Sequence, residues 1–263
     1  MSAQEMVAGS AAQARAMTVR VCLVIAYYEE GQGAVDSLNS VRLEPGDSIV
    51  VVDDGSKRLP ARDFIPKRVG EVPVILVELP QNRGIAAALQ AGVMHAPPQA
   101  EYIARLDCRD ICVEDRFLVQ RRHLDAHPEC GIVGSSVVFH DLKGKVLYTH
   151  HQPETHERIR ASMRINCAFT HPTVMFRRSV YDAAGGYSED FPHGEDFALF
   201  RAMIQLSQGY NISRPLVACA TMDGESPSGI DIVNCLREPR SFSGTGTGTP
   251  VRSMGWCVPW HSS

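Results

Sequence analysis

The sequence predicts an α/β protein with a mostly parallel sheet, and three observations support this fold class. Short apolar runs rich in β-branched residues recur through the first half of the chain, as expected for strands buried on both faces. These runs span residues 19–25, 48–54, 72–79 and 101–107. Helical spacing of apolar residues separates some of them, at 33–41 and 84–96. Strands that alternate with helices are typical of right-handed crossovers and a parallel sheet.

After Asp110 the pattern changes and predicts a smaller antiparallel part. Residues 113–129 are amphipathic and predict a helix that stops at Pro128. Residues 131–150 predict two strands around a Lys-Gly turn. The remaining expected elements are a helix at 154–163, a short strand at 171–176, a helix at 194–207 and a last strand at 213–222. The segment 55–70 is rich in Pro and Arg and gives no clear helix signal.

The length of 263 residues suits one large domain or two small ones. We expect one domain at residues 18–223, with a segment of a different character on each side. Residues 1–17 are small and polar and lack the apolar middle of a secretion signal, so we expect a disordered leader. Residues 224–263 contain the Gly/Thr-rich run 241–250, which cannot bury enough apolar surface to order itself. We therefore expect a poorly ordered tail, although Trp256 and Trp260 lie there.

Several classes of protein are disfavoured by charge, hydropathy and cysteine spacing. The formal net charge of -4 gives no general attraction to nucleic acid or anionic lipid. No apolar run reaches the ~18 residues that span a bilayer. The eight cysteines are scattered without a signal peptide, which favours free thiols, and no second pair completes a zinc set with Cys108 and Cys112. We expect a cytoplasmic protein.

Polar residues follow three of the predicted strands at their carboxyl ends, where ligands bind in parallel α/β sheets. The first strand runs into "AYYEE" (26–30), the second into "DDGS" (53–56) and the fourth into "DCRD" (107–110). The loop 82–84 opens a helix, whose backbone N–H groups and dipole favour an anion. Acidic groups beside such a helix start predict a nucleotide whose phosphates are bridged by a cation.

The motifs "VVVDDGS", "NRGIAAALQAG", "YIARLDCRD", "HPTVMFRRSVYDAAGGY" and "GEDFALF" occur in this order along the chain. Together they resemble the inverting glycosyltransferases of family 2, over about residues 19–222. The resemblance implies the GT-A fold, a Rossmann-like nucleotide-binding sheet flanked by helices.

Carried over residue by residue, the resemblance implies a donor site and a catalytic pair. The nucleotide-sugar site would comprise Ala26, Tyr28, Glu30, Asp54, Arg83, Asp107, Arg109 and His171. In that site Asp54 would bond the base, Asp107 would face the ribose and diphosphate, and His171 would begin a strand at the floor. Glu195 and Asp196 match the catalytic acidic pair, whose aspartate acts as general base on the acceptor hydroxyl. Without the resemblance, the same pair would be acids that complement a helix dipole.

Arg109 departs from the family pattern Asp-x-Asp-Asp, whose second aspartate ligates Mn²⁺ or Mg²⁺. An arginine cannot ligate a cation. Either Asp107 and Asp110 hold the metal with Arg109 turned outward, or Arg109 itself neutralises the leaving diphosphate through its guanidinium fork. The first alternative is favoured.

The resemblance implies a transferase that moves a sugar from a nucleotide-sugar, expected to be UDP-linked, to a glycan or lipid-linked acceptor in cell-surface polysaccharide synthesis. A lipid-linked acceptor would suit peripheral association with the inner membrane face. Two alternatives remain. A non-catalytic relative would bind nucleotide only, and the replacement of the family's metal-ligating aspartate by Arg109 is compatible with this alternative. A sugar nucleotidyltransferase would need a Gly-rich loop with a basic residue after the first strand, where this chain has "AYYEEGQG".

Overall fold

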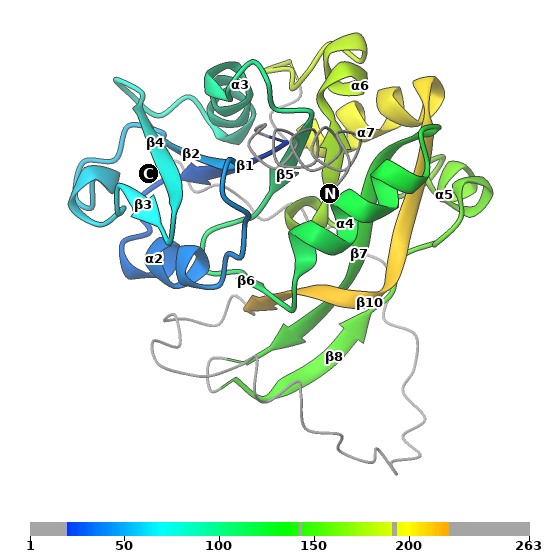
Figure 1. Ribbon diagram of the computed structural model, residues 1–263, viewed down its shortest axis with the longest axis horizontal. Coiled ribbons are helices and arrows are strands. Elements are labelled where there is room, and N and C mark those ends of the chain that lie inside the picture. The colour runs from blue at the N-terminus through cyan, green and yellow to red at the C-terminus, as the bar shows by residue number, and fades with distance from the viewer. Residues whose placement is uncertain (1–19, 142–143, 191–193, 221–263) are drawn as a thin grey trace, which may run out of the picture.

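The computed structural model describes residues 20–141, 144–190 and 194–220, which build one mixed sheet with helices on both faces (Figure 1). The strands are β1 (Val21–Tyr27), β2 (Ser48–Asp53), β3 (Arg68–Val69), β4 (Val72–Glu78), β5 (Tyr102–Arg105), β6 (Ile111–Cys112), β7 (Cys130–His140), β8 (Val146–His150), β9 (Met175–Arg177) and β10 (Gln208–Ala220). The helices are α2 (Gln32–Asn39), α3 (Ile85–His95), α4 (Arg116–Ala126), α5 (His156–Ser162), α6 (Arg178–Ala183) and α7 (Glu195–Leu206). Short 3-10 turns occur at η1 (Ala61–Asp63) and η2 (His171–Thr173).

The sheet order is β3-β4-β2-β1-β5-β9-β7-β10-β6, with β8 paired to β7. The strands β4, β2, β1 and β5 are mutually parallel, so their carboxyl ends meet at one edge. This confirms the predicted parallel half. The runs of β1 and β2 are mostly apolar because both faces are covered, and every residue of these two strands is buried.

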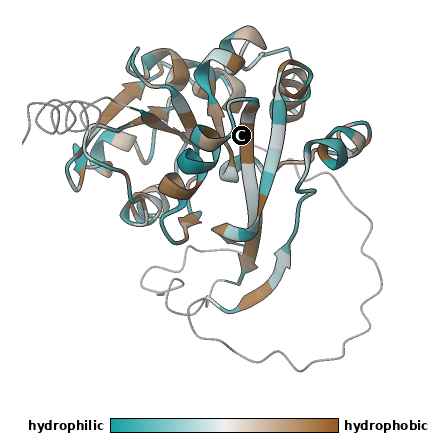
Figure 2. Ribbon diagram, turned by 45° about the vertical axis from the view of Figure 1, so that its right-hand side comes forward, coloured by the Kyte–Doolittle hydropathy of each residue, from teal (hydrophilic) through white to brown (hydrophobic). Residues whose placement is uncertain are grey.

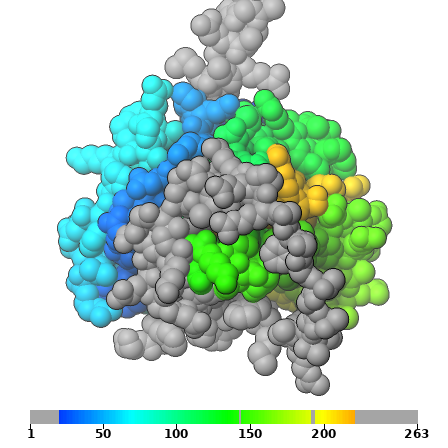
Figure 3. Space-filling view, turned by 90° about the horizontal axis from the view of Figure 1, so that it is seen from below, coloured from blue at the N-terminus to red at the C-terminus, as the bar shows by residue number. Residues whose placement is uncertain are grey.

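The predicted antiparallel part is also present. Strand β9 lies between β5 and β7 and is antiparallel to both. Strands β7 and β8 form the expected antiparallel pair. Seen from below, green residues of this part of the chain lie between the blue and cyan N-terminal half and the yellow C-terminal elements (Figure 3).

Three element predictions are wrong in detail. The last strand begins at Gln208, directly after α7, and pairs with β7 through register shifts around Pro215, which has no N–H to donate. His171 does not begin a strand, because η2 precedes β9 and Pro172 suits the first turn of such a helix. The helix expected at 113–129 is limited to α4. The tail with Trp256 and Trp260, and the leader 1–17, lie outside the described residues.

Two hydrophobic layers pack the helices onto the sheet. One layer unites α3, α6 and α7 with one sheet face, and the other unites α2 and α4 with the opposite face. In Figure 2 brown, hydrophobic segments lie next to white and teal ones along the strands. Helix α3 packs so closely that a Cβ at Gly92 would lie 2.4 Å from Cγ1 of Val24. This close contact fixes α3, and with it the loop that precedes it, against the sheet.

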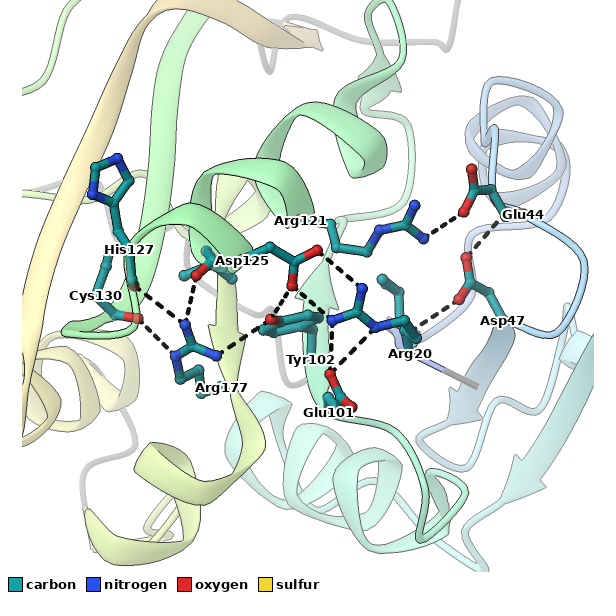
Figure 4. Close-up of polar contacts among 12 residues, drawn as sticks. Arg20, Glu44, Asp47, Glu101, Tyr102, Arg121, Asp125, His127, Cys130 and Arg177 are labelled. Carbon is teal, nitrogen blue, oxygen red and sulfur yellow. Dashed lines mark hydrogen bonds and ion pairs between the residues drawn. The ribbon is translucent and has the colours of Figure 1, made fainter. Parts of the chain in front are cut away.

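A polar network locks the amino-terminal edge of the sheet (Figure 4). Arg20 pairs with Asp125 at 2.6 Å and with Glu101 at 2.9 Å. The Tyr102 hydroxyl donates to Asp125 at 2.7 Å, and Arg177 donates to that hydroxyl at 3.2 Å. Because these residues come from β5, β9, α4 and the start of β1, the network holds the strands in register and leaves the opposite edge for loops.

Among the helices that the structure describes, none combines the length and apolar character needed to cross a membrane.

Candidate active site

The loop after β1 is held against the loop after β2. The Tyr27 hydroxyl donates to the Leu59 carbonyl at 2.6 Å and accepts from the Gly31 amide at 3.0 Å. The Glu29 carboxylate accepts backbone N–H groups of residues 57–59 at 2.7 to 3.2 Å. Desolvation opposes the charge of Glu29, but these N–H donors outweigh it and lower its pKa. The two loops that would receive a nucleoside are therefore fixed to one another.

Asp54 organises the loop that begins α3. It is fully buried, and its two oxygens accept the backbone amides of Arg83 and Gly84, each at 2.8 Å. Burial raises the pKa of Asp54. The Arg83 side chain reaches outward and pairs with Glu189 at 2.7 Å, which joins this loop to the segment before α7. The role predicted for Asp54, a direct hydrogen bond to the base, stays a prediction. In the structure its carboxylate holds the loop before α3 in place through the amides of Arg83 and Gly84.

A buried arginine lies at the end of β5. Arg105 has no exposed surface, and it donates to the carbonyls of Val24 and Leu106, each at 3.0 Å. It also pairs with the carboxylate of Asp107, whose side chain is 38% exposed. Burial opposes the charge of Arg105, but Asp107 outweighs it and raises the arginine pKa. The buried Arg105 guanidinium thus orients the Asp107 carboxylate, which remains partly exposed to solvent.

His171 links this arginine to the start of α7. Its Nε2 atom lies 2.8 Å from the Tyr187 hydroxyl and 3.3 Å from Nε of Arg105, and its Nδ1 atom lies 3.9 Å from Oε1 of Glu195. Burial, followed by the charge of Arg105, lowers the pKa of His171 to about 4. The imidazole is therefore neutral near pH 7. Since Arg105 is a donor only, Nε2 must accept and the proton belongs on Nδ1, facing Glu195.

The two acids at the start of α7 have different environments. Gly194 precedes the helix with φ of 105°, a left-handed conformation that favours glycine. Glu195 is buried, and desolvation raises its pKa. Asp196 is only partly buried, and its Oδ1 accepts the Phe197 amide at 2.7 Å. Of the pair, Asp196 is the carboxylate that a ligand can reach.

Arg109 spans the loops after β1 and β5. Its Nε donates to Glu30 at 2.6 Å, and its backbone has φ of 74°. Its side chain also packs over α2, because a Cβ at Gly33 would lie 2.7 Å from Cγ of Arg109. The next residue, Asp110, is buried, and desolvation followed by the charge of Asp107 raises its pKa well above the usual range. Arg109 and Asp107 face the same edge, whereas Asp110 is turned into the protein.

The sequence pattern of Glycosyl transferase family 2 matches residues 22–185, more than half of the chain. The chain belongs to this family. An uncharacterized glycosyltransferase of Haemophilus influenzae is 32% identical over 159 residues, which are 60% of this chain and 58% of that protein. The amylovoran biosynthesis glycosyltransferase AmsE of Erwinia amylovora is 29% identical over a region that covers 68% of this chain and 65% of the AmsE chain. The chain thus spans about three fifths of the curated relatives it matches.

Solved structures show the GT-A fold. Staphylococcus aureus TarS superposes with a TM-score of 0.61 at 15% identity, over 77% of this chain and 37% of that chain. A TarS fragment in complex with UDP-GlcNAc gives a TM-score of 0.60 at 16% identity, over 81% and 61%. The mannosyltransferase PcManGT from Pyrobaculum calidifontis, solved with GDP-Man and Mn²⁺, gives 0.56 at 19% identity, over 79% and 58%.

The family's metal position is altered in this glycosyl transferase family 2 chain. No group of three or more His, Cys, Asp or Glu side chains arranged to hold a metal occurs in the described part of the chain. Asp107 remains reachable, and a Mg²⁺ or Mn²⁺ ion can bind through one carboxylate and the phosphates of a substrate. Asp110 suits a cation poorly in this conformation, because its burial favours the protonated form. The residues present therefore fit a cation held by Asp107 and the donor together.

The predicted site residues occupy one edge of the sheet but form two groups. Glu30 contacts Arg109, and Asp54 contacts the backbone of Arg83. Asp107 and His171 contact Arg105, Glu195 lies near His171, and Asp196 follows Glu195 on α7. Ala26 is the buried penultimate residue of β1, which ends at the buried Tyr27, and Tyr28 follows the strand. The roles of all these residues stay predictions.

Sequence analysis missed three residues of the site: Arg105, Tyr187 and Glu29. For Arg105 a signal was available, because an arginine inside the apolar run "YIARL" needs buried partners. Glu29 lies within the run "AYYEE" and Tyr187 ends the motif "HPTVMFRRSVYDAAGGY", but neither residue was assigned a role.

Proposed function

We propose that this chain is an inverting glycosyltransferase that moves a sugar from a nucleotide-sugar, UDP-linked, to a glycan or lipid-linked acceptor. The observation that carries the proposal is the partly exposed Asp196 carboxylate at the helix start, next to the cluster of Glu195, His171 and Arg105 that ends at Asp107. Family membership supports the reaction class. The relative named for amylovoran biosynthesis supports a role in polysaccharide synthesis, and neighbours solved with UDP-GlcNAc or GDP-Man support a nucleotide-sugar donor.

In this proposal the nucleoside lies between the loops that Glu29 and Asp54 fix. These loops keep their shape before the donor arrives, so less conformational entropy is lost on binding. The diphosphate lies toward Asp107 and Arg109, which face the same edge of the sheet.

Transfer proceeds in one displacement. Asp196 removes the proton from the acceptor hydroxyl while that oxygen forms its bond to the anomeric carbon. The bond from that carbon to the donor phosphate oxygen breaks on the opposite face, which inverts the configuration. The nucleoside diphosphate departs with the electron pair, and the Arg109 guanidinium stabilises its charge. A divalent cation, held by Asp107 and the diphosphate, would supply further charge neutralisation when bound.

Glu195 has a different part in this proposal. Its burial and its position near Nδ1 of His171 suit a carboxyl group that positions the start of α7. In this proposal Asp196 acts on the acceptor, whereas Glu195 positions the start of α7.

Incubation of the full chain with single nucleotide-sugars, with and without Mn²⁺, tests the proposal by release of the nucleoside diphosphate. Release that is faster than the spontaneous rate for one donor, and faster still with glycan or lipid-linked acceptors, is expected. Nucleotide binding without any release, for every donor with and without metal, would instead fit the non-catalytic alternative.

A further inference from the structure

A basic hollow lies between α5 and the second half of α7, apart from the residues of the candidate active site. Its volume is about 180 Å³. Its lining comprises Arg160, Met163, Arg164, Arg201, Ile204 and Gln205. A wider, more open depression of about 530 Å³ adjoins it, shares Arg160, Ile204 and Gln205, and adds Leu206 to the lining. Both elements lie at the right-hand side of Figure 1, away from β3 and β4.

The hollow carries positive charge that the described residues do not neutralise by direct contact. Three of its lining residues are arginines and none is acidic. Within the described ranges, none of the three forms an ion pair with a carboxylate, whereas the exposed Arg62, Arg83 and Arg214 each do so. Glu157 lies one turn before Arg160 on the same helix, and its pKa is lowered mainly by hydrogen bonds from its own backbone N–H and from Thr155 and only slightly by Arg160. Glu129 lines the wider depression. Convergent guanidinium groups without an anion repel one another, so the hollow favours a phosphate-bearing ligand.

Two exposed aliphatic side chains adjoin the arginines, Ile165 as the next residue in the chain and Leu206 in the lining of the wider depression. Ile165 is 82% exposed and directly follows Arg164, and Leu206 is 56% exposed at the end of α7. Beneath them, Met163 and Ile204 are buried and anchor the two segments to the core. The surface therefore presents cations together with protruding aliphatic groups on a rigid base.

We propose that this α5–α7 surface, defined by Arg160, Arg164, Arg201, Ile165 and Leu206, docks on an anionic lipid bilayer. The guanidinium groups bind lipid phosphates, and the two aliphatic side chains enter the region below the headgroups. Clustered arginines with flanking aliphatic residues are the chemistry by which peripheral proteins recognise such surfaces. This inference goes beyond the proposed reaction and holds with any donor or acceptor.

Other occupants fit less well. A free phosphate or diphosphate would satisfy the arginines but would leave Ile165 and Leu206 in water. A symmetric contact with a second copy would bring the three arginines of each chain against each other, because a two-fold interface pairs the same patch with itself. An anionic bilayer satisfies both the charges and the aliphatic groups.

The test is binding of the full chain to vesicles of phosphatidylcholine, with and without phosphatidylglycerol. The parent should bind only the anionic vesicles, and 1 M salt should weaken binding strongly, because the screening length falls to about 3 Å. Arg160→Gln/Arg164→Gln/Arg201→Gln should reduce the partition coefficient by about 100-fold, on the scale of 1 kcal/mol per arginine. Ile165→Ser/Leu206→Ser should reduce it by about tenfold and leave the salt dependence unchanged.

A matched control separates the patch from net charge. Arg42→Gln/Lys67→Gln/Arg68→Gln removes three exposed cations near α2 and β3, on the opposite side of Figure 1 from α5 and α7, and should bind like the parent. Loss of binding by this control equal to that of the arginine variant would overturn the proposal. So would equal binding of the parent to vesicles with and without phosphatidylglycerol.

Two further outcomes would also overturn it. Inorganic pyrophosphate could raise the melting temperature of the parent, but not of the arginine variant, while the vesicles remain unbound; the hollow would then be a site for a free anion. A dimer that Ile165→Ser/Leu206→Ser dissociates, again without vesicle binding, would make the surface an interface between copies. Because no outcome depends on turnover, a failure here is distinguishable from a failure of the proposed reaction.

Discussion

His171 makes a quantitative prediction for stability in acid. The imidazole is packed among Tyr187, Arg105 and Glu195, and its pKa falls from 6.5 to about 4 through burial and then through the charge of Arg105. In the unfolded chain it regains its ordinary pKa. Between pH 6.5 and about 4, His171 is therefore protonated in the unfolded state and neutral in the folded state. Stability should fall as the pH decreases through this window and level off below about 4.

The magnitude follows from the width of that window. It spans about 2.5 pH units, and each unit corresponds to about 1.36 kcal/mol, so His171 accounts for a loss of about 3 kcal/mol over the whole range. Between pH 7 and pH 5 the loss is about 2 kcal/mol. A loss of this size is a large fraction of the stability of an ordinary domain.

Urea unfolding at a series of pH values measures the effect, and His171→Gln isolates it. Glutamine has no titrating group, so the variant should lose about 2 kcal/mol less than the parent between pH 7 and pH 5, whatever its stability at pH 7. His95→Gln, at an exposed position on α3, should keep the parent's pH dependence. If His171→Gln followed the parent curve, the burial and neutrality assigned to His171 would be refuted.

Three further predictions concern the site and its scaffold. Arg109→Asp should fold normally, because aspartate adopts the left-handed backbone conformation of that position more readily than arginine does. The variant's rate of donor turnover should depend more strongly on Mn²⁺ concentration than the parent's rate; the same Mn²⁺ dependence in both proteins would contradict this prediction. Gly92→Ala should destabilise by about 1–3 kcal/mol in thermal unfolding, because the added Cβ would lie 2.4 Å from Val24; a neutral effect would mean that α3 shifts freely. Tyr102→Phe should cost about 1–3 kcal/mol in urea unfolding, because the Asp125 carboxylate loses a charged hydrogen bond; a change below 0.5 kcal/mol would show that the network adds little.

The parallel half of the fold could be predicted from the sequence because its signal is local. In β1 and β2 every residue is buried, so the strands appear as unbroken apolar runs, and the turn residues between them mark their ends. The start of β10 could not be predicted in this way. Its first residues, including Tyr210 and Asn211, are mixed in polarity, and their strand conformation depends on pairing with β7, which is distant in sequence.

The site was predictable in position but not in its internal contacts. The acidic strand ends placed Asp107 and Glu30 at one edge by topology alone. The burial of Asp110 depends on packing against β10, where Cys219 is its partner, and no local pattern reveals that contact. The same holds for Tyr187, which reaches His171 only because β9 and α6 fold back beside β5.

The central claim is that Asp196, and not its buried neighbour, removes the proton from the acceptor. The most direct measurement is the rate of sugar transfer by Asp196→Asn, together with the nucleoside diphosphate affinity of the same protein by calorimetry. Asp182→Asn, an exposed aspartate on α6, is the matched control. The account predicts a rate loss of about 10²–10⁴-fold for Asp196→Asn with the affinity nearly unchanged, and parent behaviour for the control. Transfer by Asp196→Asn within about threefold of the parent would contradict it, since general-base catalysis contributes far more than that.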